Sequence, residues 1–327
     1  MRSPVSIVCS VALAVLAACT QGLDLGGQRL ERVAFGSCLH QDKPAPIWEA
    51  IVAAEPDAWV WLGDNIYGDT DDGAVLAAAY AKVKVQPGYA RLRESARVFG
   101  TWDDHDFGKN NGGKEWHGKA VAQEALLDFL EEPVDSPRRE REGVYAAYDF
   151  GSGAERVKLL LIDVRTHRDD PKQAGGDLFG KAQRAWIEEE LADNEAALTI
   201  VASGTQVIPE DHRYEKWAQF PESRQWFFER LVESGTGAVL FVSGDRHISE
   251  FSQLELPGRE APVYEMTTSS LTHSWSDFSG EVNRHRVGEV FAQNNFGLLE
   301  IDWSARVARV TIRDEAGAVQ RALAIEL

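Results

Sequence analysis

Residues 58–69 read AWVWLGDNIYGD, an apolar run that passes directly into a segment with two glycines and two aspartates. The apolar part, residues 58–62, has the length and the aromatic and β-branched content of a buried strand. The polar part begins where that strand would end, with Asp64 and then Tyr67. Open α/β sheets bind ligands beyond the carboxyl ends of their strands. This stretch therefore predicts an α/β protein with a functional site at one sheet edge.

Four further apolar runs end in the same way. Residues 32–38 read RVAFGSC, residues 96–106 read ARVFGTWDDHD, residues 157–165 read VKLLLIDVR, and residues 238–247 read AVLFVSGDRH. Any one of these polar residues could instead be a loop carboxylate that caps a helix. Because all five runs carry polar residues at the corresponding end, we expect these side chains to meet in one site.

The side chains at these strand ends are types that hold metal ions. Cys38 as a thiolate and Tyr67 as a phenolate are strongly donating ligands that suit trivalent iron, although a lone cysteine can also be a small core residue. Carboxylates suit calcium or another hard divalent cation, and the candidates are Asp64, Asp104 and Asp245. His247 follows Asp245 by two residues, so on an extended segment both would face one metal pair. Paired metals clamp the attacking and leaving oxygens of a phosphoryl displacement.

The rest of the chain alternates short β-branched or aromatic runs with amphipathic stretches. Strands are expected at residues 32–36, 58–62, 96–101, 157–162, 198–202, 238–242, 263–267 and 297–303. Helices are expected at residues 47–54, 73–83, 119–130, 180–194 and 221–234. Residues 306–312 and 322–326 are expected to pair around a turn at 315–317. This order predicts an α/β fold with two sheets packed face to face and no linker that divides it.

Taken together, these blocks resemble the alkaline phosphatase D (PhoD-like) family of calcineurin-like metallophosphatases. Residues 63–69 (GDNIYGD) resemble the second metallophosphatase block, in the version with a tyrosine after the bridging aspartate. Residues 103–106 (DDHD) and 243–247 (SGDRH) resemble the Gly-Asn-His and Gly-His-x-His blocks, each with an aspartate at one ligand position. The segments 163–168, 203–206 and 294–297 are similar to further landmarks of the family. The resemblance implies a four-layer αββα sandwich of two mixed sheets flanked by helices.

The same resemblance implies roles for individual residues. Iron (Fe³⁺) would be held by the thiol of Cys38, the phenol of Tyr67 and the imidazole of His247. The carboxylate of Asp64 would bridge the iron to a second metal. Asp104 and Asp245 would hold that second metal or a pair of calcium ions, and other divalent metals would suit the same oxygens. His105 would be the acid or phosphate-positioning group, because histidine has the unperturbed pKa nearest neutrality.

Two positions near these blocks have alternative interpretations. Asp104 could instead face Arg165 while Asn110 or Asn111 takes the metal. Arg165 could grip substrate phosphate through bidentate hydrogen bonds, or it could form an ion pair with Asp163 or Asp169, and the same two alternatives apply to Arg168 and Arg246.

Aromatic and histidine residues outside the blocks are expected to play lesser parts. Trp59 and Trp61 lie at strand positions and are expected in the core. Three tryptophans in polar loops could line the mouth of the site, namely Trp116, Trp217 and Trp275. The remaining histidines are expected at the surface or rim; they are His40, His117, His167, His212, His273 and His285.

The first residues have the pattern of an export signal. Arg2 precedes an almost unbroken apolar run over residues 5–18, which is too short to span a bilayer. The run ends in LAAC at residues 16–19, which resembles a bacterial lipobox with Cys19 as the lipidation site; a plain secretory signal with an incidental cysteine is the alternative. We expect a signal peptide at 1–18, a tether at 19–28 and a PhoD-like metallophosphatase domain at 29–327. Thr20 after Cys19 favours the periplasmic side of an outer membrane.

The net charge of −18 argues against nucleic-acid binding, because phosphate backbones demand basic patches. It allows a phosphate-ester substrate, since bound cations would reverse the local field. We expect a secreted, monomeric hydrolase of phosphomonoesters and/or phosphodiesters that uses a metal-activated water. The alternatives are a phosphodiesterase specific for a lipid head group or wall polymer, and a non-catalytic surface-binding lipoprotein with the same fold.

Overall fold

The computed structural model describes residues 23–25, 27–192 and 194–327. The predicted signal peptide and the predicted lipidation site, Cys19, lie outside these residues. Within the predicted tether, Leu23–Leu25 form strand β1. No helix in the described ranges combines the length and the apolar character needed to cross a membrane.

Two mixed sheets form the framework. The eight-stranded sheet contains, in spatial order, β1, β5 (Ala146–Phe150), β6 (Val157–Leu161), β7 (Leu198–Ser203), β8 (Ala238–Ser243), β10 (Val263–Thr268), β9 (Ser249–Leu254) and β11 (Arg286–Phe291). The six-stranded sheet contains β14 (Val319–Glu326), β13 (Val307–Asp314), β12 (Asn295–Asp302), β2 (Arg32–Gly36), β3 (Ala58–Leu62) and β4 (Arg97–Thr101). Strands β2, β3 and β4 are parallel, and so are β6, β7 and β8. Their carboxyl ends therefore meet at one edge of each sheet.

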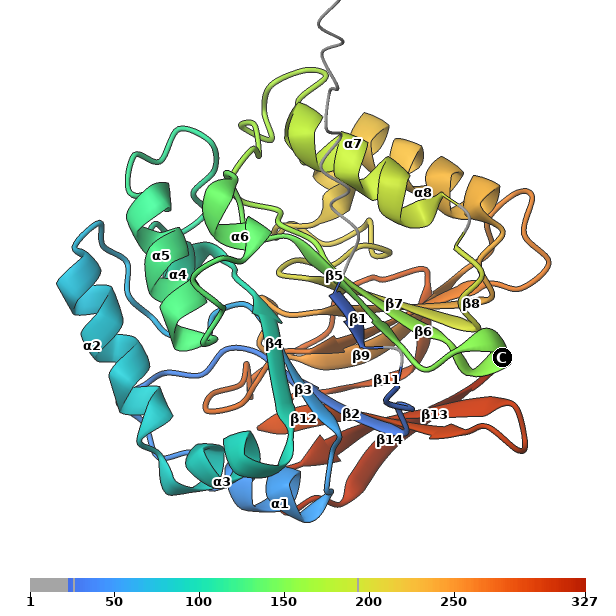
Figure 1. Ribbon diagram of the computed structural model, residues 1–327, viewed down its shortest axis with the longest axis horizontal. Coiled ribbons are helices and arrows are strands. Elements are labelled where there is room, and N and C mark those ends of the chain that lie inside the picture. Colours follow the sequence, from blue (N-terminus) through green and yellow to red (C-terminus); the bar gives the residue numbers. More distant parts are fainter. Residues whose placement is uncertain (1–22, 26, 193) are drawn as a thin grey trace, which may run out of the picture.

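Helices cover the outer faces of both sheets, as Figure 1 shows. The group that packs on the six-stranded sheet comprises α1 (Ile47–Ala53), α2 (Gly73–Lys84), α3 (Pro87–Ser95) and α5 (Lys119–Phe129). The eight-stranded sheet is covered by α7 (Gly180–Leu191) and α8 (Pro221–Ser234). Short helical turns occupy the connections: α4 (Asp104–Phe107), α6 (Pro137–Glu140), η1 (Gly153–Glu155) and η2 (Trp217–Gln219). The layers run helix, sheet, sheet, helix, which confirms the predicted αββα sandwich.

Strand β3 shows why its apolar run is continuous. Val60 and Leu62 point into the core between the two sheets, and Trp59 and Trp61 point into the core beneath the helices. All four side chains are fully buried. Successive side chains of a strand face opposite ways, so a strand covered on both faces needs apolar residues at every position. The predicted core location of Trp59 and Trp61 is confirmed.

The predicted strands and helices are all present, with ends that differ by up to a few residues. Helix α7, for example, ends at Leu191 and was expected to continue to residue 194. The strands that were not predicted are β1, β5, β9 and β11, and the helices that were not predicted are α3 and the short turns α4, α6, η1 and η2. Strand β11 has no apolar face in its sequence and contains Gly288, and only its pairing with β9 identifies it as a strand.

Candidate metal centre

The candidate metal centre consists of six side chains on loops that follow β2, β3, β4 and β8; they are Cys38, Asp64, Tyr67, Asp104, Asp245 and His247. The first three strands belong to the six-stranded sheet and β8 belongs to the other, so the corresponding edges of both sheets contribute. Gly244 permits this close approach, because a Cβ added there would lie 2.7 Å from the carbonyl oxygen of Leu62.

Four of these residues have a left-handed backbone, which non-glycine residues rarely adopt. The φ angle is 59° at Cys38, 51° at Asp64, 69° at Asp245 and 53° at His247. Each such conformation costs on the order of 1–3 kcal/mol and persists only where the surroundings hold it, commonly at functional sites. Their concentration here indicates that the fold directs these side chains at the cost of backbone strain.

Cys38 lies at the buried end of the centre. Its Sγ is 3.5 Å from Asp64 Oδ2 and 3.1 Å from Ser269 Oγ. Cys38, Asp64 and His247 each offer a ligand atom, and the three atoms lie within 4.8 Å of one another. Burial raises the pKa of the Cys38 thiol to about 12 when no cation is near. Sulfur, oxygen and imidazole nitrogen at this spacing form a donor set for a transition metal.

Tyr67 is held between two histidines. Its Oη lies 2.9 Å from His247 Nε2 and 3.0 Å from His273 Nε2. Burial lowers the pKa of His247 to about 4 and that of His273 to about 3, so both imidazoles are neutral and keep a lone pair. His273 was expected at the rim, and the structure brings it against a candidate ligand. It follows the end of β10, and this strand-end position is the signal that could have identified it.

Asp64 also belongs to a second group, with Asp104 and His105. One ligand atom from each of the three lies within 4.8 Å of the others. Asp104 opens helix α4, where Asp103 and Asp106 form a capping box. Asp106 also accepts a hydrogen bond from the backbone N–H of Asp64, at 3.3 Å. This buried carboxylate, which the sequence did not single out, therefore ties the loops after β3 and β4 together.

The structure does not support the predicted alternative in which Asp104 faces Arg165. Arg165 pairs with Asp103, and Asp104 Oδ2 accepts a hydrogen bond from the backbone N–H of Asn111 at 2.7 Å. Burial opposes the ionisation of Asp104, but the positive charges of Arg165 and His105 outweigh burial and lower its pKa. Asn110 and Asn111 line the same cavity as Asp104.

His105 is oriented by Asp69. His105 Nδ1 lies 2.8 Å from Asp69 Oδ1 and 3.0 Å from Asp69 Oδ2. Burial opposes protonation of the imidazole, but the hydrogen bond to Asp69 and the neighbouring carboxylates outweigh it and raise the pKa of His105. With Nδ1 engaged, Nε2 is the ring nitrogen left to exchange a proton in the cavity.

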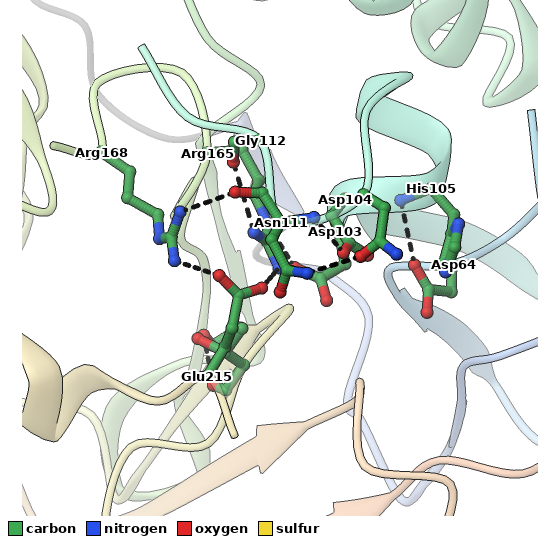
Figure 2. A network of polar contacts seen from close by, with 12 residues as sticks. Asp64, Asp103, Asp104, His105, Asn111, Gly112, Arg165, Arg168 and Glu215 are labelled. Atoms are coloured by element: carbon green, nitrogen blue, oxygen red, sulfur yellow. Dashed lines mark hydrogen bonds and ion pairs between the residues drawn. The ribbon is translucent and has the colours of Figure 1, made fainter. Parts of the chain in front are cut away.

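Arg165 does not occupy the position predicted for a phosphate-gripping residue. Its side chain is fully buried, with Nη2 2.6 Å from Asp103 Oδ1 and 2.7 Å from Glu215 Oε2 (Figure 2). Nη1 donates to the carbonyl oxygen of Gly112 at 3.3 Å. The guanidinium donors are thus directed at buried carboxylates and backbone, and Arg165 is not among the residues that line the cavity.

The predicted ion-pair partners of Arg165 are also wrong. Asp163 accepts hydrogen bonds from backbone N–H groups, including that of Arg165 at 2.8 Å, and Asp169 pairs with Lys114. Arg168 and Arg246 do line the cavity, and they pair with Glu215 and Glu281 respectively.

The candidate metal centre opens into a cavity of about 1020 Å³. Its lining includes Asp64, Asp104, His105, Asp245 and His247 next to the centre, and Trp275 farther out. Trp275 is therefore at the mouth, as expected. Trp217 is not, because its ring is fully buried in the core beneath α8.

The donor set fits metal cations. In the described part of the chain, no lysine or arginine forms an ion pair with Asp64, Asp104 or Asp245. Burial, together with the charge of Asp104, raises the pKa of Asp245 to about 7. Buried carboxylates that lack a direct ion-pair partner are costly, and bound cations would remove that cost.

Comparison with known proteins identifies a family and a fold. A family model described as PhoD-like phosphatase matches residues 77–312. A solved structure described as "Structure of PhoD" has a TM-score of 0.69 and 15% sequence identity, over 91% of this chain and 68% of that one. Another, "GAP50 the anchor in the inner membrane complex of Plasmodium", has a TM-score of 0.61 and 14% identity, over 92% and 90%. At these identities the two structures establish the fold alone. No curated protein matches the chain.

Proposed function

This chain belongs to the PhoD-like phosphatase family, and from that premise we propose that it hydrolyses small phosphodiesters and phosphomonoesters at neutral to alkaline pH. The family makes it a metal-dependent hydrolase of phosphate ester bonds. The proposal goes further in naming both ester types, with diesters at least as good as monoesters.

One observation carries the proposal. Five candidate side chains line one open cavity, namely Asp64, Asp104, His105, Asp245 and His247. Cys38 and Tyr67 complete the group through their contacts with Asp64 and His247. When bound, metal ions supply Lewis acidity there and lower the pKa of water. The chain's own groups would then have to hold the ions, orient the phosphate and deliver a proton.

The donors divide by chemistry. We assign Cys38, Tyr67 and His247 to iron, because a thiolate and a phenolate favour a trivalent ion. Asp104 and Asp245 offer hard oxygens for calcium or another divalent ion. Asp64 is a member of both three-residue groups, which supports a bridging role between the two ions.

His105 is the proposed acid for the leaving oxygen. The hydrogen bond to Asp69 raises the pKa of His105 and holds the ring so that Nε2 is the nitrogen left to donate a proton. Of the three arginines considered for gripping phosphate, we assign that role to Arg168. It lines the cavity, and its Nη1 is held by the carbonyl oxygen of Asn111 at 3.1 Å.

The proposed setting is the bacterial cell envelope. Residues 1–18 would be removed as a signal peptide, and Cys19 would carry the lipid that holds a monomeric enzyme, through the tether at 19–28, to the periplasmic side of the outer membrane. Residues 29–327 would form the enzyme domain. Cys19→Ser should leave the protein exported but released from membranes in fractionation, since only the acyl anchor is lost.

A direct assay tests the catalytic proposal. Purified protein, with iron and calcium quantified in the same sample, is given p-nitrophenyl phosphate and bis(p-nitrophenyl) phosphate, before and after chelation and metal return. Hydrolysis that disappears with the metals and returns with them is the expected result. A fully metallated protein that hydrolyses neither ester would favour the non-catalytic surface-binding alternative.

A further inference from the structure

The cavity is much larger than the candidate metal centre, and one side of it is aromatic. Beyond His247 it is lined by Arg213, Tyr214, Arg246 and Trp275. The Tyr214 and Trp275 rings meet edge to face with centroids 5.8 Å apart. We call Tyr214, Arg246 and Trp275 the aromatic wall. A volume of about 1020 Å³ leaves room for a substituent well beyond a phosphate group.

The aromatic wall is fixed relative to the candidate metal centre. The backbone N–H of Trp275 donates to the carbonyl oxygen of His247 at 2.7 Å. Arg246 stands in the chain between Asp245 and His247, and its Cζ lies 4.2 Å from the centroid of the Tyr214 ring. The second ester group of a phosphate bound at the centre would therefore lie beside the aromatic wall.

The wall offers the cavity an aromatic and guanidinium surface. Arg246 pairs with Glu281 and stacks on Tyr214, so its charge is already compensated. Trp275 is only partly buried, although the Phe278 ring packs edge to face against it with the ring centroids 5.2 Å apart. Arg213 lies with its Cζ 5.0 Å from the centroid of the Tyr214 ring and donates a hydrogen bond to Tyr214 Oη at 3.1 Å. A planar ring gains most from such a surface, because nucleic-acid bases stack readily on aromatic and guanidinium groups.

We propose that the aromatic wall is a subsite for a planar aromatic ring carried by one substituent of a phosphodiester substrate, as in a nucleoside 5′-phosphodiester. The proposal rests on the proposed phosphodiesterase function and adds its substrate class. The substrate is a small molecule, because a net charge of −18 disfavours a polymeric nucleic acid.

The test compares two diesters that release the same p-nitrophenolate. Thymidine 5′-(p-nitrophenyl phosphate) carries a base, and methyl p-nitrophenyl phosphate carries no ring beyond the leaving group. The ratio of their kcat/KM values isolates the contribution of the nucleoside. We expect a wild-type ratio of about ten or more, because stacking a base on an aromatic side chain is worth roughly a 5- to 150-fold change in binding.

Variants locate that contribution. Trp275→Ala should lower the ratio about fivefold or more, and Trp275→Phe should retain most of it, since a phenyl ring still stacks. Trp116→Ala is the matched control, because Trp116 lies outside the cavity lining, and its ratio should equal that of the wild type. Metal content is measured for every variant, and a common loss of activity cancels in the ratio.

The outcomes separate the two proposals. A wild-type enzyme that hydrolyses the methyl diester but shows the same ratio as Trp275→Ala would overturn the aromatic subsite and leave the phosphodiesterase function intact. A metallated wild type that hydrolyses neither diester would overturn the proposed function itself, and the subsite with it.

Discussion

Arg165 offers the sharpest test of structure against sequence, because the two assign it different roles. Arg165→Gln removes a fully buried guanidinium that lies 2.6 Å from Asp103 and 2.7 Å from Glu215. Removing one partner of a buried ion pair leaves an uncompensated buried charge and costs about 3–5 kcal/mol. Glu215 retains Arg168 as a partner, so the lower end of that range is expected. With an unfolding entropy of about 2.1 cal/mol/K per residue, such a loss lowers the melting temperature of a chain of this size by roughly 5 °C.

Stability and kinetics are to be measured on the same metallated samples. Circular dichroism during heating and urea titration gives the unfolding free energy, and initial rates on bis(p-nitrophenyl) phosphate give kcat and KM. Arg309→Gln is the matched control, because Arg309 is exposed on β13 and its loss should change stability by no more than about 0.5 kcal/mol. If Arg165 gripped the substrate instead, Arg165→Gln would melt with the wild type while its KM rose, since only ground-state and transition-state binding would be lost. That result would refute the scaffold role.

The remaining predictions concern pH, the proton donor and the iron ligands. Burial raises the pKa of Glu265 to about 7, from 4.5 in the unfolded chain. The folded state therefore holds this proton more tightly, so Glu265 contributes its full stabilisation below pH 4.5 and loses it as the pH rises through 7. Between those pH values the unfolding free energy of the wild type should fall by about 3 kcal/mol more than that of Glu265→Gln. Urea titrations at a series of pH values measure both, and an equal fall in the two proteins would contradict this prediction. His105→Ala should keep its metals and lose roughly two to four decades of rate, whereas loss of metal would make His105 a ligand. Asp69→Asn removes the carboxylate charge that helps to raise the pKa of His105, so the basic limb of the pH–rate profile should move to lower pH. Cys38→Ser should weaken iron binding and change the visible absorption, and Tyr67→Phe should remove the phenolate contribution to it. A colourless, fully active wild type that carries only zinc or calcium would contradict the iron assignment.

Much of the fold was predictable because its central strands are covered on both faces. The apolar run of β3 could be recognised without any tertiary information, and so could the polar residues that begin where it ends, Asp64 and Tyr67. The edge strand β11 could not be recognised, because the exposed Gly288 and Glu289 interrupt its apolar residues and its pairing with β9 supplies the order. A local pattern therefore predicts an element whose environment is uniform and misses one whose stability comes from a neighbour.

The sequence by itself determined which residue types follow the strands, and hence that Cys38, Asp64 and Asp245 would be candidates for one metal site. This follows because parallel strands bring their carboxyl ends to the same edge. Tertiary structure decided which of those polar groups actually meet. His273 contacts Tyr67, which is 206 residues away in the sequence, and Arg165 pairs with Asp103, which is 62 residues away. Adjacent carboxylates such as those at 103 and 104 look alike in a sequence, and only the direction in which the backbone turns after β4 sends one to a buried arginine and the other to the cavity.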